Sequence, residues 1–277
     1  MRQATTLVLA LFLLSCSTLD SMLGDNRPTA SIVGTSLQGL TLQGVDLLFD
    51  VELSNPYAVA LPLLGMDYKL SHGTTTFLSG QGAEMGSVPA NGKKVIPLRA
   101  KLDFLPALNL LQGVRPGAVI DYVADIGLRV DAPAIGELRL PIQKTGQLPI
   151  PTVPKVSVNN IRWDKLSLTE AAATLDLGIE NTNDFPVDLS TLAYALRLAG
   201  TEVAGSTLTN PVSLASGAAK NLLLNFSLKP SDLGLAAFRM LSGSGAGYEI
   251  GGNMNLQTAF GAISAPFQNS GQTQFKK

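Results

Sequence analysis

The stretch Val45-Asp-Leu-Leu-Phe-Asp-Val-Glu-Leu53 alternates apolar and polar residues with a period of two. A second stretch, Ala173-Thr-Leu-Asp-Leu-Gly-Ile179, shows the same alternation in the other half of the chain. Alternation of this kind is typical of a strand that has one face in a core and the other in water. The sequence therefore predicts β-structure in both halves.

Further strands are expected around these two. In the first half they are predicted at 64–70, 75–79, 94–102, 120–130 and 137–143, with counterparts 125 or 126 residues later. His72-Gly73 and Ala199-Gly200 are turn signals between paired strands. Short, regularly spaced strands predict an all-β fold of two tandem fibronectin III-like or immunoglobulin-like β-sandwich domains, with one short helix in each.

The chain repeats itself at an offset of 126 residues. This offset brings prolines, asparagines and tyrosines into register, as in the pairs Pro28 and Pro154, Asn55 and Asn181, Tyr68 and Tyr194, and Tyr122 and Tyr248. A slip of one residue near residue 135 then aligns Gly146 with Gly271. We interpret the repeat as a duplicated domain, 28–150 and 151–277. The join 148–154 contains three prolines and is expected to be extended and semi-rigid.

One short helix is predicted in each half. In the second half Pro230-Ser231-Asp232 predicts the start, with Ser231 as the N-cap and an apolar run over 233–241. The equivalent helix is expected at 103–111, with Pro106 in its first turn. The apolar residues cover more than one helical face. They could pack in the core, contact the sister domain or line a groove for an acyl chain.

The residues that follow the strand at 45–53 carry a family resemblance. Val51-Glu-Leu-Ser-Asn55-Pro56-Tyr57 leads into Leu61-Pro-Leu63 and then Met66-Asp-Tyr68-Lys-Leu70. This resembles the group 2 late embryogenesis abundant family (LEA type 2), also called the water stress and hypersensitive response (WHy) domain. The second half keeps Asn181, Phe185-Pro186-Val187 and Tyr194, but it replaces Asn-Pro with Asn181-Thr-Asn-Asp184. The resemblance therefore covers tandem copies, of which the second is the more divergent.

The residue types of this motif predict a structural role. Asparagine tolerates turn conformations and binds nearby backbone groups, and Pro56 stops the strand from pairing further. Tyr68 and Tyr194 are expected to pack a ring inside and to leave the hydroxyl at the rim. A ligand-binding role for the motif, which includes Asn55, Tyr57, Asn181 and Pro186, is the alternative.

The N-terminus reads as the signal peptide of a lipoprotein. Arg2 precedes the apolar run 7–14, and Leu13-Leu-Ser-Cys16 resembles the bacterial lipobox. The resemblance implies a signal peptide at 1–15, a thioether-linked diacylglycerol and an N-acyl chain on Cys16, and a lipidated tether at 16–27. An ordinary secretory signal with a chance cysteine is the alternative. Ser17, in place of Asp, resembles the sorting pattern for the outer membrane, so we expect the protein at its periplasmic face.

Composition and side-chain chemistry exclude several function classes. A net charge of −1 with no basic run gives no basis for nucleic-acid binding. His72, the single histidine, sits beside a turn glycine, so neither a catalytic triad nor a zinc site is expected. Asp121, Asp125 and Asp131 lack the spacing of a calcium loop. The only tryptophan, Trp163, is expected to be a core anchor. We therefore expect no metal, and no cofactor apart from the acyl chains on Cys16.

Gly243-Ser-Gly-Ala-Gly247 lacks the Lys-Ser/Thr ending of a phosphate-binding loop and is interpreted as a flexible turn.

These observations favour a non-catalytic envelope lipoprotein. The family resemblance implies protection of the cell envelope during desiccation or other stress, which is an inference from family rather than from chemistry. One alternative is a module that binds or transfers lipid or another envelope component. A scaffold for another envelope protein is a further alternative. The expected partners are the membrane, reached through the anchor, and either lipid or a second envelope protein.

Overall fold

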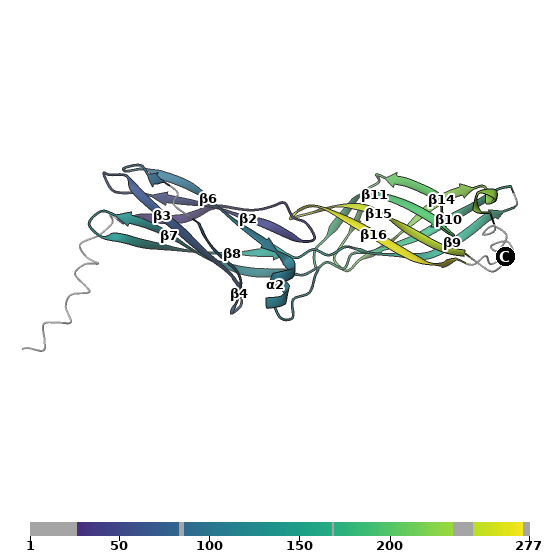
Figure 1. The fold of residues 1–277 in the computed structure, drawn as a ribbon, viewed down its shortest axis with the longest axis horizontal. Helices are drawn as coiled ribbons and strands as arrows, with labels where there is room; N and C mark the ends of the chain where they lie inside the picture. The colour runs from purple at the N-terminus through teal and green to yellow at the C-terminus, as the bar shows by residue number, and fades with distance from the viewer. Residues whose placement is uncertain (1–26, 83–85, 168, 235–245, 274–277) are drawn as a thin grey trace, which may run out of the picture.

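The computed structural model describes residues 27–82, 86–167, 169–234 and 246–273. They form two β-sandwiches that follow one another along the long axis of the molecule (Figure 1). All strand pairs are antiparallel. The predicted all-β fold with two repeated halves is therefore confirmed.

The first half places a three-stranded sheet opposite a larger one. The small sheet has the order β1-β2-β6, and the large sheet has the order β4-β3-β7-β8 with the short β5 beside β3. The bounds are β1 Thr29–Gln38, β2 Gly44–Ser54, β3 Leu61–His72, β4 Thr75–Gly82, β5 Ser87–Val88, β6 Lys93–Asp103, β7 Val119–Ala132 and β8 Gly136–Pro149.

The second half repeats this arrangement strand by strand. Its small sheet is β9-β10-β14, and its large sheet is β12-β11-β15-β16 with the short β13 beside β11. The bounds are β9 Lys155–Leu166, β10 Ala171–Glu180, β11 Val187–Leu198, β12 Thr201–Leu208, β13 Val212–Leu214, β14 Ala219–Leu228, β15 Ala246–Thr258 and β16 Gly261–Thr273.

The core of each half lies between its two sheets. The alternation in β2 has the expected effect, because Val45, Leu47, Phe49, Val51 and Leu53 are all buried. The apolar positions of β10 are buried in the same way. Each predicted strand is found, and most extend beyond the predicted bounds because backbone pairing continues past the residues that face the core.

The strands that sequence patterns did not single out are the edge strands β1 and β9 and the short strands β5 and β13. Six of the ten residues of β1 are exposed and none is fully buried, and a bulge between Ile32 and Gly34 shifts its register against β2. An edge strand with half of its side chains in water gives a weaker hydrophobic alternation than a central strand.

The predicted helices differ between the halves. In the first half α2 (Phe104–Leu110) follows Asp103 at the N-cap position, close to the predicted range. In the second half the structure gives a four-residue 3₁₀ helix, η1 (Pro230–Leu233), whose N-cap is Lys229. The prediction of Ser231 as the N-cap is therefore wrong, because Pro230 already takes the first helical position, which suits its fixed φ. Residues 235–241 of the predicted helix lie outside the described residues.

The start of the join between the halves is held by the first half. Leu148 and Ile150 are buried, and β8 extends to Pro149. The Ile150 amide donates to the carbonyl of Ala118 (2.9 Å), and the Gly117 amide donates to the carbonyl of Ile150 (2.6 Å). The join is thus fixed by contacts with the first half, in addition to the stiffness that its prolines supply.

Candidate functional site

Asn55 lies at the centre of a buried hydrogen-bond cluster at the end of β2. Its side-chain nitrogen donates to the carbonyls of Val59 (2.8 Å), Val88 (3.2 Å) and Pro89 (2.9 Å). Its Oδ1 accepts from the amide of Tyr57 (3.0 Å). The side chain of Asn55 therefore connects the loop before β3 to the segment that follows β5.

Asn181 builds the same cluster in the second half. Its Nδ2 donates to the carbonyls of Phe185 (2.8 Å), Leu214 (3.2 Å) and Ala215 (3.0 Å), and its Oδ1 accepts from the amide of Asn183 (3.1 Å). Each partner is displaced by 126 residues from its counterpart around Asn55. Both side-chain nitrogens donate only to carbonyls of the chain's own backbone, and Asn181 Oδ1 also accepts from the side chain of Asn183 (3.0 Å). This arrangement favours a structural role for the motif over ligand binding.

The neighbours of the two asparagines are less alike. Pro56 and Tyr57 are half-buried, and the Tyr57 hydroxyl is buried without a hydrogen-bond partner among the described residues. Pro186 is exposed and directly precedes β11. Pro62, which the sequence comparison matched to Pro186, is instead the second residue of β3. The two prolines are therefore not equivalent, and the position that matches Pro186 in the first half is Ala60.

The predicted rim tyrosines belong to a wider set of tyrosine–glycine pairs. Tyr68 lies across from Gly80, Tyr122 from Gly146 and Tyr248 from Gly271. In each pair the glycine leaves room for the ring. A Cβ at Gly146 or Gly271 would lie 2.6 Å from the hydroxyl of its tyrosine. Tyr194 departs from this pattern. Ser206 faces it on β12, and a Cβ at Gly252, its partner on β15, would meet backbone atoms rather than the ring.

The divergent motif of the second half forms the junction between the two sandwiches. Asn183, which stands where the first half has Tyr57, exchanges two hydrogen bonds with the backbone of Thr152 (2.8 and 3.1 Å). The amide of Asp184 donates to the carbonyl of Gly117 (2.7 Å). Arg115 forms an ion pair with Asp184 and donates to the carbonyl of Thr182 (3.1 Å).

Sequence patterns did not identify these junction residues. The signal that could have found them is the replacement of Asn-Pro by Asn-Thr-Asn-Asp at the motif of the second half. The departure from the family pattern coincides with a polar contact that only a second, preceding domain can supply. The junction is therefore a property of the tandem chain rather than of a single copy.

We expect Gly117→Val to weaken the junction. Gly117 has a φ of +93°, and a Cβ there would lie 2.8 Å from the carbonyl oxygen of Thr182. The free energy of unfolding should fall by about 1–3 kcal/mol, and small-angle X-ray scattering should show a broader range of interdomain orientations. Gly113→Val is the matched control, because Gly113 also has a positive φ (+84°) but nothing lies within 4 Å of its Cβ position. Equal scattering changes in both variants would contradict the role of the junction.

The remaining polar candidates are surface groups. His72 ends β3, and its Nδ1 lies 2.7 Å from the carbonyl oxygen of Asp121. The side chain of Asp121 accepts from Gln147, and that of Asp125 accepts from Gln143. The described residues contain no group of three or more His, Cys, Asp or Glu side chains that could hold a metal ion.

Asp67 and Arg139 form a two-point ion pair on the outer face of the large sheet of the first half. The guanidinium donates to both carboxylate oxygens (3.1 and 2.6 Å). These hydrogen bonds from Arg139 lower the pKa of Asp67 below its ordinary value. The side chains of Arg139 and Asp67 are 48% and 34% exposed, so water screens the pair and it stabilises the fold little.

The other residues that the sequence singled out are either half-buried, part of a strand, or outside the described residues. Trp163 is half-buried and meets Phe226 edge to face, with ring centroids 6.0 Å apart. Ala246 and Gly247, expected in a flexible turn, begin β15, and the glycine-rich residues before them lie outside the described part. Cys16, the signal peptide and the tether also lie outside it. Among the described residues, no helix is long and apolar enough to cross a membrane.

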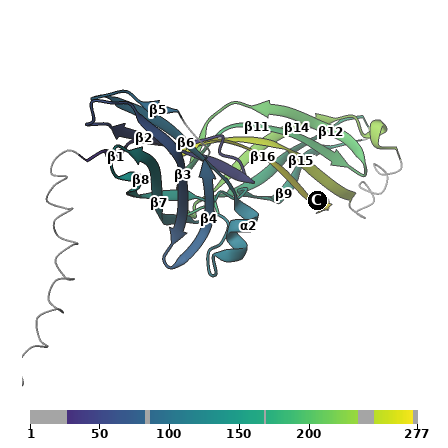
Figure 2. The same cartoon turned by 60° about the vertical axis from the view of Figure 1, so that its left-hand side comes forward.

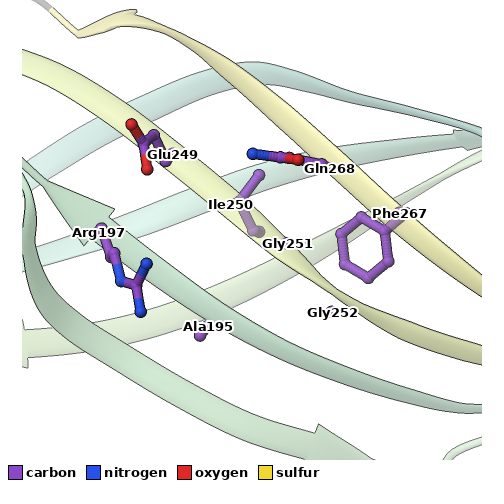
Figure 3. A pocket seen from close by; sticks show the side chains of 8 residues that line it. All are labelled: Ala195, Arg197, Glu249, Ile250, Gly251, Gly252, Phe267 and Gln268. Carbon is purple, nitrogen blue, oxygen red and sulfur yellow. The ribbon is translucent and has the colours of Figure 1, made fainter.

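The second half carries a shallow pocket on the outer face of its large sheet (Figure 3). It measures about 300 Å³, and its floor includes Ala195, Gly251 and Gly252. Arg197 and Glu249 lie toward one side of it, and Phe267 toward the other. The repeat places Lys69 and Asp125 in the first half where the second half has Ala195 and Gly251, so smaller side chains at these two positions accompany the hollow. Its charged and amide side chains suit a polar contact better than an acyl chain.

Comparison with known proteins agrees with this architecture. The family model described as late embryogenesis abundant protein matches the chain twice, at residues 50–146 and 176–271. A desiccation-related protein of Arabidopsis thaliana is 30% identical over 126 residues, which is 46% of this chain and 76% of that protein. The desiccation protectant protein Lea14 homolog of Glycine max is 28% identical over 127 residues, 46% of this chain and 84% of that protein.

A solution structure of a late embryogenesis abundant protein is 27% identical, covers 49% of this chain and 81% of that one, and has a TM-score of 0.39. The two family matches coincide with the two sandwiches and contain both asparagine clusters. The chain belongs to the late embryogenesis abundant protein family and carries two copies of its domain in tandem.

Proposed function

We propose that this chain is a non-catalytic lipoprotein that protects the bacterial cell envelope during desiccation or related stress. The observation that carries the proposal is the double family match, together with relatives that are named as desiccation proteins. The lipobox resemblance at Cys16 adds the location: an acylated protein at the periplasmic face of the outer membrane. Three acyl chains on one residue would make a lasting anchor.

The physical character of the two sandwiches fits protection by a folded surface. Charged residues make up 15% of the chain, and each half buries a continuous apolar core. A disordered protectant instead has low hydrophobicity and high charge. We infer that protection depends on folded domains held close to the membrane, where their surfaces contact the structures that drying would damage.

Lipid carriage is the second function that we considered. A lipid carrier needs an apolar channel that accepts an acyl chain. Two hollows of the described second half are bordered by charged and amide groups, among them Arg197, Glu249, Arg162 and Gln272. Protection therefore has more support than carriage. Native mass spectrometry of the anchor-free protein tests this preference. A phospholipid that co-purifies in a fixed ratio would favour lipid carriage over protection.

The proposal predicts that Cys16→Ser abolishes lipidation and envelope retention, because the thiol is the sole acyl acceptor of this kind. Cells that lack the protein should lose viability after drying and rehydration. The wild-type gene should restore survival, and Cys16→Ser should not. Incorporation of labelled palmitate into Cys16→Ser would contradict the anchor. Equal survival with and without the wild-type protein would contradict the protective role.

A further inference from the structure

Helix α2 has more apolar surface than the core accepts. Phe104 and Ala107 are buried against the first half. On the other side of the helix, Leu105 is 72% exposed and Leu110 is 53% exposed. Two large leucines thus face water on a helix of seven residues. A feature of this kind calls for an explanation that a single exposed apolar residue does not need.

The helix projects from the side of the first half, close to the junction, in both Figure 1 and Figure 2. The chain carries no charged residue from Phe104 to Val114, and Pro106 adds to the exposed apolar surface. The result is an uncharged protrusion rather than a groove. An uncharged apolar protrusion can insert into an apolar environment such as the interface of a lipid bilayer.

The position of α2 agrees with the reach of the tether. Gly44 at the start of β2 pairs with Asp103, directly before α2, and Ser54 at the other end pairs with Thr29, where the chain enters. Ten residue steps along β2 at about 3.3 Å each place α2 about 33 Å from the entry point. About eleven residues separate Cys16 from Pro28 and can span at most about 40 Å. A membrane-anchored Cys16 therefore lets the first half lie flat with α2 on the lipid.

The size of the patch argues for lipid rather than a protein partner. A stable protein interface takes about 800 Å² from each partner, which is well beyond two leucines and a proline. Shallow insertion into a bilayer needs no complementary groove, and apolar side chains on one face of a helix can enter the acyl boundary. Such a contact is weak alone, but tethering raises its effective concentration to about the millimolar range.

We propose that α2 is a membrane-contact element. Leu105 and Leu110 insert into the surface of the membrane that holds the anchor, so the first half lies along the bilayer. This proposal rests on the proposed function in one respect, because acylated Cys16 supplies the tether in the cell. An artificial tether separates the two proposals.

The test uses residues 16–277 with Cys16→Ser and an N-terminal histidine tag, held on phosphatidylethanolamine–phosphatidylglycerol vesicles that contain a nickel-chelating lipid. Since the natural cysteine is then absent, Leu105→Cys provides a single site for an environment-sensitive dye. Leu223→Cys is the matched control, because Leu223 is 67% exposed on β14 in the other half. Circular dichroism melts of both labelled proteins check that the fold is kept.

We expect the dye at position 105 to shift to the blue, to gain fluorescence several-fold on vesicles, and to be quenched by a quencher in the acyl region. The dye at position 223 should show none of these changes. Equal signals at both positions would overturn the proposal. A blue shift at position 105 without vesicles, rising with protein concentration, would indicate self-association and would also overturn it. Neither result depends on whether Cys16 is acylated in cells.

Discussion

Replacing Asn55 by alanine is expected to lower the free energy of unfolding of the first half by about 3 kcal/mol or more. The side chain is almost completely buried, and its nitrogen supplies the donor for three carbonyl oxygens. Alanine fills less of the site and donates nothing, so these oxygens lose their partner where little water can replace it. Chemical denaturation followed by circular dichroism measures the loss.

The control for this variant is Asn221→Ala. Asn221 is an exposed asparagine on β14 whose amide reaches Asp176 only at 3.4 Å. Its replacement should change the stability by no more than about 0.5 kcal/mol. Asn181→Ala should resemble Asn55→Ala in the second half and should also disturb the junction, because Asn183 hydrogen-bonds Asn181. If Asn55→Ala lowers the free energy of unfolding by less than about 1 kcal/mol, the structural role is contradicted and ligand binding becomes the better hypothesis for the motif.

Replacing Phe49 by alanine is expected to cost about 3–5 kcal/mol in the first half. Phe49 is fully buried on the central strand of the small sheet, and its ring meets Tyr122 edge to face at 6.4 Å. Removing the ring leaves a cavity between two sheets that are fixed by backbone pairing on both sides, so the site can collapse only in part. The expected result is a large shift of the midpoint of denaturation.

The single tryptophan can report whether destabilising the first half also destabilises the second half. Trp163 lies in the second half, so its fluorescence follows the unfolding of that half alone, whereas circular dichroism follows both. If the junction couples the halves, Phe49→Ala should also lower the midpoint that Trp163 reports, and Gly117→Val should remove that coupling. Leu223→Ala, at an exposed leucine, should leave both signals within about 0.5 kcal/mol of wild type. An unchanged circular dichroism midpoint in Phe49→Ala would contradict the placement of this residue in the core.

The sequence predicted the strands best where one face of the sheet is fully buried. Alternation in β2 and β10 reflects a local rule, since successive side chains of a strand point to opposite faces. The edge strand β1 follows the same rule, but half of its side chains face water and its register shifts at a bulge, so the pattern fades. The start of the helix near Ser231 was misplaced because Pro230 competes for the same turn.

By itself the sequence determined the duplication and the all-β class, because these depend on local periodicity and on a repeat that can be read along the chain. The structural role of Asn55 and Asn181 stays a prediction, which the hydrogen bonds of both side chains support. Only the tertiary structure showed what the second half gains where its motif, Asn-Thr-Asn-Asp, differs from the Asn-Pro of the first half. Asn183 and Asp184 contact Thr152 and Gly117 because the two sandwiches meet end to end (Figure 1). The exposure of Leu105 likewise depends on which face of α2 the sheets cover. Contacts between distant segments follow from how whole domains are placed, and that placement is fixed by many weak interactions together rather than by the residues of any one segment.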